Sequence, residues 1–202
     1  MNVLALVTSV KLMPHMTPWA EDLARTLLQE ALPRRWAHVQ GVAARARGIA
    51  GTLGSDADLV EASAWLHDIG YLPSLAASGM HQLDGARYLR DIQHADDLLC
   101  RMVAHHSCAH IEADERGLAR DLFHEFTPAP LGLARALTFC DMTTSPDGEA
   151  VSVGHRLAEI HERYGPGHLV SRSIRRATPL ILDAVGTISS GKPRYGELCP
   201  AR

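Results

Sequence analysis

The sequence lacks several features that would assign it to a large protein class at once. Lysine is nearly absent, since Lys11 and Lys192 are the only two among 202 residues. Any phosphate recognition must therefore fall to arginine, histidine and backbone amides. The four cysteines contain no CxxC pair, so a structural zinc ribbon is not supported. Cys100 and Cys140 lie in apolar runs, and we expect them to be core residues in a reducing compartment.

Long apolar runs are also missing. The stretch 1–10 is apolar but too short to span a membrane, and no basic region or cleavage site marks it as a signal peptide. We therefore expect a cytoplasmic protein with no membrane partner. The net charge of −3 argues against duplex nucleic acid as a partner, because duplex binding usually leaves a basic footprint. Nothing in the sequence indicates an oligomeric state.

Aromatic residues make up only 5% of the chain, and sustained alternating β-type runs are absent. Ala, Leu, Arg and Glu dominate the periodic segments, and 46% of the residues are hydrophobic. We predict an all-α, single-domain helical bundle over 17–190, an N-terminal extension at 1–16 and a flexible C-terminal tail at 191–202. The expected helices are 18–32, 34–50, 56–68, 82–92, 95–106, 115–125, 129–141, 150–164 and 168–189.

The most informative local feature is the pair His67-Asp68. An imidazole and a carboxylate stand together where an apolar helix ends, so both can turn toward one cation. Burying this pair is costly without a partner, and a divalent metal makes it favourable. The plainer alternative is a histidine at a helix C-terminus with a capping aspartate.

Further candidate ligands lie on or near other predicted helices. His38 lies in a segment whose Trp36, Val39 and Val42 recur at helical spacing and pack inward. Asp141 closes an apolar helix, at the end where the helix dipole disfavours a negative charge, so a cation partner is the simplest account. His81 and the doublet His105-His106 lie between these positions.

The order His, His-Asp, Asp resembles the HD superfamily of metal-dependent phosphohydrolases, over roughly residues 34–164. The resemblance implies a helical fold and a first metal site, and members with a second metal add histidines between the His-Asp pair and the last Asp. Asp68 would then bridge two divalent transition metals, although the sequence leaves open whether one or two ions are bound and whether they are Fe, Mn, Co, Ni or Zn. The implied metal ligands are His38, His67, Asp68, His81, His106 and Asp141.

Within the doublet we favour His106 as the ligand. The dipeptide His106-Ser107 resembles the His-Thr or His-Ser found at this place in relatives with two metals. His105 is left to meet the substrate, and with Asp68 it is the expected catalytic residue. His110 lies on the face of His106 if the helix continues, as a substrate-binding candidate, although a solvated loop histidine is the alternative. Arg34 and Arg35 lie close enough to His38 to help hold a phosphate, unless they belong to a solvated helix face.

One position departs from the commonest family pattern. Tyr71 stands three residues after Asp68, where many members carry a Lys or Glu. A metal-bound hydroxide would then carry more of the work. We also expect Arg156 and Glu159 to form a helix surface pair, with an inward Arg156 as the alternative. Loops at 71–80, 107–114 and 142–149 are expected to hold specificity.

Taken together, we expect a metal-dependent phosphohydrolase that acts on a small phosphorylated metabolite, such as a nucleotide or related phosphoester. Two alternatives stay open at this point. Some relatives with the same ligand pattern use two irons and dioxygen to cleave a carbon bond. The second alternative is a non-catalytic domain that binds a nucleotide as a signal, which Tyr71 invites.

Overall fold

The computed structural model describes residues 15–191, which form a helical molecule with one isolated bridge between Thr144 and Ala150. No strand occurs in this range, so the all-α prediction is confirmed. The ten α-helices of the described range are α1 (Met16–Leu28), α2 (Pro33–Leu53), α3 (Ala57–Leu66), α4 (His81–Asp91), α5 (Asp97–His105), α6 (Ala109–Arg116), α7 (Ala119–Glu125), α8 (Leu131–Met142), α9 (Val153–Tyr164) and α10 (Leu169–Ser189). Three short 3₁₀ turns are η1 (Gly54–Asp56), η2 (Ile69–Tyr71) and η3 (His106–Cys108).

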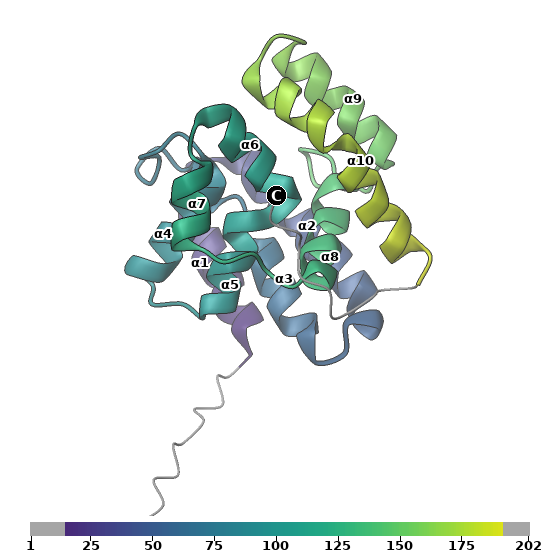
Figure 1. Cartoon of the computed structure of the whole chain (residues 1–202). Helices are drawn as coiled ribbons and strands as arrows, with labels where there is room; N and C mark the ends of the chain where they lie inside the picture. Colours follow the sequence, from purple (N-terminus) through teal and green to yellow (C-terminus); the bar gives the residue numbers. More distant parts are fainter. Residues whose placement is uncertain (1–14, 192–202) are drawn as a thin grey trace, which may run out of the picture.

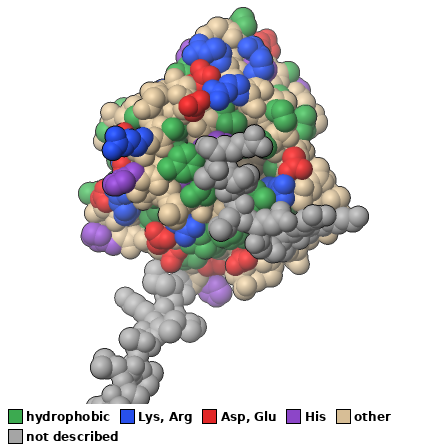
Figure 2. All heavy atoms as spheres, viewed as in Figure 1, with side chains coloured by type: hydrophobic (Ala, Val, Ile, Leu, Met, Phe, Trp, Pro, Cys, Tyr) green, Lys and Arg blue, Asp and Glu red, His purple; other side chains and the backbone are tan. Residues whose placement is uncertain are grey.

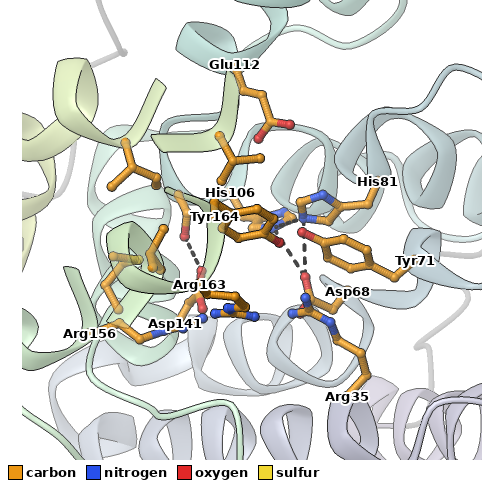
Figure 3. Close-up of a pocket in the computed structure, with 15 residues that line it drawn as sticks. Arg35, Asp68, Tyr71, His81, His106, Glu112, Asp141, Arg156, Arg163 and Tyr164 are labelled. Atoms are coloured by element: carbon orange, nitrogen blue, oxygen red, sulfur yellow. Dashed lines mark hydrogen bonds and ion pairs between the residues drawn. The ribbon is translucent and has the colours of Figure 1, made fainter. Parts of the chain in front are cut away.

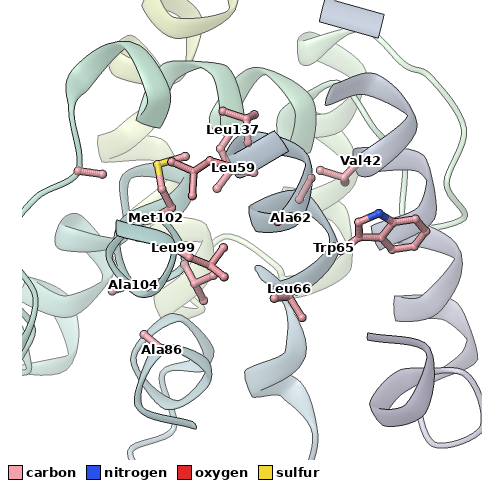
Figure 4. Close-up of a cluster of buried hydrophobic side chains, with 14 of the residues drawn as sticks. Val42, Leu59, Ala62, Trp65, Leu66, Ala86, Leu99, Met102, Ala104 and Leu137 are labelled. Carbon is pink, nitrogen blue, oxygen red and sulfur yellow. The ribbon is translucent and has the colours of Figure 1, made fainter. Parts of the chain in front are cut away.

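Helix α3 is the centre of the core. Most of its side chains are buried because it packs against α1, α2, α5 and α8. Its small residues, such as Ala62, let the neighbouring helices approach closely, and Leu66 fills the space at its end (Figure 4). Trp65 stacks on Trp36 of α2 with ring centroids 5.5 Å apart. Full burial of a Leu contributes about 1.5–3 kcal/mol, so Leu66 and Trp65 anchor the end of α3 from which His67 and Asp68 follow.

Helix α1 begins at Met16, earlier than the predicted start at residue 18. Asp58 of α3 accepts hydrogen bonds from the main-chain N–H of Met16, at 2.7 Å, and of Thr17, at 3.2 Å. The first orphan N–H groups of α1 are therefore capped from another helix. Residues 1–14 and 192–202 lie outside the described range, so most of the predicted extension and tail does too.

Several other predicted helix boundaries are wrong. The first helix ends at Leu28, and Pro33 is the first residue of α2, where its missing N–H costs nothing. The segment 107–114, expected to be a loop, instead contains most of α6, and the helix expected at 115–125 is split into α6 and α7. Gly117 ends α6 in a left-handed conformation, with φ of 73°.

Helices α9 and α10 lie side by side at one corner of the molecule (Figure 1). A small second core joins them to the end of α8 through Met142, Ile160, Ala177 and Ile181. This packing places α9 next to Asp141. On the face drawn in Figure 2, acidic and basic side chains are interspersed, with no large patch of one sign. None of the helices in the range 15–191 is long and apolar enough to cross a membrane.

Candidate metal centre

The six predicted ligands converge, although they come from segments spread over about a hundred positions. Their ligand atoms form three overlapping groups, and within each group the atoms lie within 4.8 Å of one another. All three groups draw on His67 or Asp68, so they describe one cluster. The groups are His38, His67 and Asp68; His67, His106 and Asp141; and Asp68, His81 and His106.

The local backbone explains how the His-Asp pair reaches this cluster. Helix α3 ends at Leu66, His67 follows as its C-cap, and Asp68 leaves the helical conformation with φ of −105°. Gly70 then lets η2 press against the start of α4, because a Cβ there would lie 2.0 Å from the carbonyl oxygen of His81. The absence of a side chain at Gly70 therefore allows His81 to lie close to His67 and Asp68.

Three of the histidines are oriented by the main chain. His38, His67 and His106 each make an Nδ1 contact with a backbone carbonyl oxygen, at 2.9, 2.8 and 2.7 Å respectively. A carbonyl can only accept, so each Nδ1 donates and each Nε2 keeps its lone pair for the cluster. Nε2 of His67 is fully buried and has no hydrogen-bond partner among residues 15–191. An orphaned acceptor of this kind fits a metal ligand.

Asp68 lies between two pairs of imidazoles. Its Oδ2 is 3.8 Å from Nε2 of His38 and 3.5 Å from Nε2 of His67. Its Oδ1 is 3.3 Å from Nε2 of His81 and 3.9 Å from Nε2 of His106. One carboxylate oxygen thus faces each pair, which fits the predicted bridging role.

Asp141 closes the first side of the cluster. Its Oδ1 lies 3.1 Å from Nε2 of His38, and its Oδ2 accepts a hydrogen bond from the Ser107 hydroxyl at 2.5 Å. Because His38 uses its Nδ1 proton elsewhere, the 3.1 Å contact needs a second proton or a metal ion between two lone pairs. Burial alone would raise the pKa of Asp141, but His38, His67 and Arg156 hold that pKa well below its usual range.

Burial lowers the pKa of His67, His81 and His106. They are therefore neutral near pH 7, which is the form that binds a metal. Burial would raise the pKa of Asp68, but Arg35, His67 and His81 together hold it well below the usual value. Neutral imidazoles with ionised carboxylates are the donor set that suits Fe, Mn, Co, Ni or Zn.

Arg35 lies directly beside the cluster, where a substrate-binding residue is expected to lie. Its Nη1 lies 2.5 Å from Oδ2 of Asp68, and its guanidinium lies 3.8 Å above the ring of Tyr71. Tyr71 in turn stacks on His81, with centroids 3.9 Å apart. Burial raises the pKa of Tyr71, so the residue that replaces the common Lys or Glu is a neutral phenol in the pocket wall.

Arg34 does not reach the cluster. It is exposed and forms a two-point ion pair with Asp147, with Nε to Oδ1 at 2.9 Å and Nη2 to Oδ2 at 3.1 Å. The structure therefore does not bring this predicted substrate-binding residue to the pocket, and favours the alternative of a solvated helix face.

His105 and His110 also lie away from the cluster, which corrects their predicted placement. Nε2 of His105 contacts the carbonyl oxygen of Phe126 at 2.8 Å, and its ring packs on Phe123. Both histidines line a separate cavity of about 920 Å³ between α6, α7, α8 and α10. The physical reason is η3, where Ser107 and Cys108 have φ of 48° and 61°. This left-handed turn ends the helix, so the expected four-residue spacing no longer applies.

A cavity of about 70 Å³ opens in front of the cluster and is lined in part by residues that sequence reasoning missed (Figure 3). Glu112 was assigned to a loop because α6 was not predicted. Arg163 and Tyr164 come from the end of α9. Arg156 pairs with Glu159 as expected, but it is only 5% exposed and lines the pocket, so the inward alternative holds. The four-residue spacing of Arg156, Ile160 and Tyr164 places them on one helix face, and this was the sequence signal that could have indicated an inward Arg156.

The comparison with family models gives one match, described as HD domain, over residues 35–144. No curated protein and no solved structure matches the chain. The matched range contains Arg35 and all six clustered residues, whereas α9 and α10 lie beyond it.

Proposed function

The chain belongs to the HD domain family, and from this premise we propose that it is a metal-dependent phosphohydrolase that acts on a small phosphorylated metabolite. The observation that carries the proposal is the position of Asp68, with one carboxylate oxygen facing each of two histidine pairs. Such a centre can hold two cations a few ångströms apart, which is the arrangement used to clamp both sides of a phosphoryl group. The proposed ligands are His38, His67, Asp68 and Asp141 for a first ion, and Asp68, His81 and His106 for a second.

When bound, the metal ions would lower the pKa of a coordinated water and polarise the phosphoryl oxygens. The protein's own groups prepare the site for this chemistry. The main-chain carbonyls that accept from Nδ1 fix the tautomer and the ring orientation of His38, His67 and His106. The hydroxyl of Ser107 holds the carboxylate of Asp141 in one orientation.

Arg35 supplies a permanent positive charge at the pocket. A guanidinium offers planar donors that match the oxygens of a phosphate. Tyr71 packs beneath this guanidinium and limits its motion. In the proposed reaction Arg35 binds the phosphoryl group and offsets the charge that develops on it. Tyr71 stays protonated at neutral pH, so we assign it positioning and not base catalysis.

The proposal is tested with protein purified without added metal. Elemental analysis gives the resident ions, and a panel of phosphorylated metabolites is then assayed for phosphate release in air and under anaerobic conditions. We expect release that does not depend on oxygen, is lost after chelation and returns with metal. D68N should lose the activity, whereas D97N, which changes an exposed carboxylate on α5, should keep it.

The two alternatives give different results in the same experiment. Turnover that occurs only in air with iron would replace the hydrolase by an oxygenase. Tight binding of a nucleotide with no turnover under any metal condition would replace it by a sensor domain.

A further inference from the structure

We propose that α9 adds a second anion-binding subsite to the pocket, formed by Arg156 and Arg163, and that the substrate therefore carries a carboxylate or a second phosphate besides the reacting phosphoester. This inference rests on the proposed function, which places the phosphoester at the metal centre. The substrate class is a compact molecule with two anionic groups on a short carbon chain.

Arg156 is the first observation. Its side chain is buried, with 5% of the residue exposed, and it lines the same cavity as Asp68 and Asp141. Its Nε has no hydrogen-bond partner among the described residues. A buried N–H donor without a partner is costly to the fold, even though Nη1 of the same guanidinium is paired. An anionic group of a bound ligand would satisfy it.

The second observation is the balance of charge on α9. Nη1 of Arg156 donates to Oε2 of Glu159 at 2.5 Å, and Nη2 of Arg163 donates to the same oxygen at 2.8 Å. Two guanidinium groups thus share the carboxylate of Glu159, and the charge of Arg156 also acts on Asp141. Both arginines line the pocket, but Glu159 does not. When Asp141 is engaged by a metal ion, as the proposed function requires, the two guanidinium groups on this wall favour an anion.

The third observation is where these residues lie relative to the metal centre. Figure 3 shows Arg156 and Arg163 on the side of the pocket where Asp141 lies, with Glu112 at the far side. Helix α9 starts at Val153, beyond the range 35–144 that matches the HD domain. The subsite therefore lies outside the range of the chain that matches the HD domain.

The lining also limits what joins the two anionic groups. Ile160, Val170 and Ile174 form an apolar surface beside the arginines. The cavity of about 70 Å³ is far smaller than the several hundred cubic ångströms typical of pockets for large ligands. A few methylene carbons fit this surface better than a nucleobase does. This favours a short phosphorylated acid over the nucleotide that the sequence suggested.

A matched pair of phosphonates tests the subsite without any turnover. 3-Phosphonopropionate carries a carboxylate where propylphosphonate carries a methyl group, and neither has a phosphoester bond to hydrolyse. Binding of each to the Mn²⁺-loaded full-length protein is measured by calorimetry. We expect the carboxylate to improve binding about tenfold or more in the wild type. R156Q should remove this preference, and R175Q, which changes an exposed arginine on α10, should retain it.

Because Arg156 is buried, R156Q could fail to fold, so circular dichroism and a melting curve accompany each variant. R163Q changes a more exposed member of the subsite and should reduce the preference about threefold or more. R156K, which keeps the charge but loses the planar donors, should keep only part of it. Equal binding of the two phosphonates by the wild type, or an unchanged preference in folded R163Q, would overturn the subsite.

The result separates the subsite from the proposed reaction. A preference for 3-phosphonopropionate in a protein that releases phosphate from no ester would contradict the proposed hydrolase function and support the anion-binding subsite. Phosphate release from singly anionic esters, together with equal binding of both phosphonates, would do the reverse.

Discussion

Nη1 of Arg35 lies 2.5 Å from Oδ2 of Asp68, the oxygen that also faces His38 and His67. The guanidinium therefore competes for the lone pairs of Oδ2 with the cation that the cluster is shaped to hold. It holds the pKa of Asp68 low even though burial would raise it. The same charge attracts a phosphate and repels a metal ion. Arg35 is therefore expected to strengthen phosphate binding and to weaken metal binding.

Replacing Arg35 by Gln should separate these two effects. We expect R35Q to bind Mn²⁺ more tightly, by about threefold to tenfold, because a nearby positive charge is removed. The same variant should raise KM for a phosphoester about tenfold or more, because a charge-assisted contact is lost. Competition with a chelating dye gives the first value and steady-state kinetics the second. R47Q, which changes an exposed arginine on the same helix, is the control. A lower metal affinity in R35Q would contradict this account.

Removing the shared carboxylate should affect both metal positions. D68N is expected to reduce the metal content below one ion per chain and phosphate release about 100-fold or more. D141N should weaken binding of the first ion more than that of the second, because Asp141 contacts His38 and His67 and shares a ligand group with His106 but none with His81. Elemental analysis after dialysis distinguishes the two variants. Identical metal content in D68N and the wild type would rule out the bridge.

Acidification should destabilise the metal-free protein. Burial lowers the pKa of His67, His81 and His106 below the ordinary value of 6.5, so the unfolded chain binds protons that the folded chain does not. The free energy of unfolding should be fully present above about pH 6.5 and decrease as the pH falls toward the folded pKa values. Asp68 and Asp141, whose folded pKa values lie below 3.8, add a further loss below about pH 4.

Urea denaturation across this pH range measures the effect. Three histidines set an upper limit of about 4 kcal/mol per pH unit for the first stage. A free energy of unfolding that stays constant between about pH 7 and about pH 5 would show that these histidines are not protected from protons in the fold.

Gly70 should tolerate no side chain. A Cβ there would meet the carbonyl oxygen of His81 at 2.0 Å, and backbone cannot rotate away as a side chain can. We expect G70A to lower the free energy of unfolding by about 1–3 kcal/mol and to weaken binding of the second metal ion. The control is G186A on α10, where no atom lies within 4 Å of the added Cβ. That variant should be more stable by up to about 1 kcal/mol. Equal stability of the two variants would refute the close approach at Gly70.

The set of six clustering residues was predicted through the resemblance to the HD superfamily, and residue type at helix ends gave an independent signal for three of them. His67 and Asp68 follow an apolar helix, and Asp141 stands at the end of another, where a negative charge is unfavourable without a cation. These local conflicts with the fold point to the same site from different parts of the chain. The helical fold followed from composition and periodicity in the same way.

The errors come from backbone conformation that residue type does not encode. Ser107 and Cys108 adopt left-handed φ values without a glycine, so the turn that separates α5 from α6 gave no sequence signal. Glu112 was therefore missed, and His105 and His110 were assigned to the wrong place. Arg156 was assigned mainly to the surface, because the packing of Ile160 beside Met142 is tertiary information.

The turn at η3 has one more consequence. His105 and His106 are joined by a single peptide bond, yet one ring faces the larger cavity and the other faces the cluster. The main chain at this point separates the two cavities. A molecule bound in the larger cavity would lie against His105 and Cys108, which flank His106 and Ser107 in the chain, although no described residue lines both cavities.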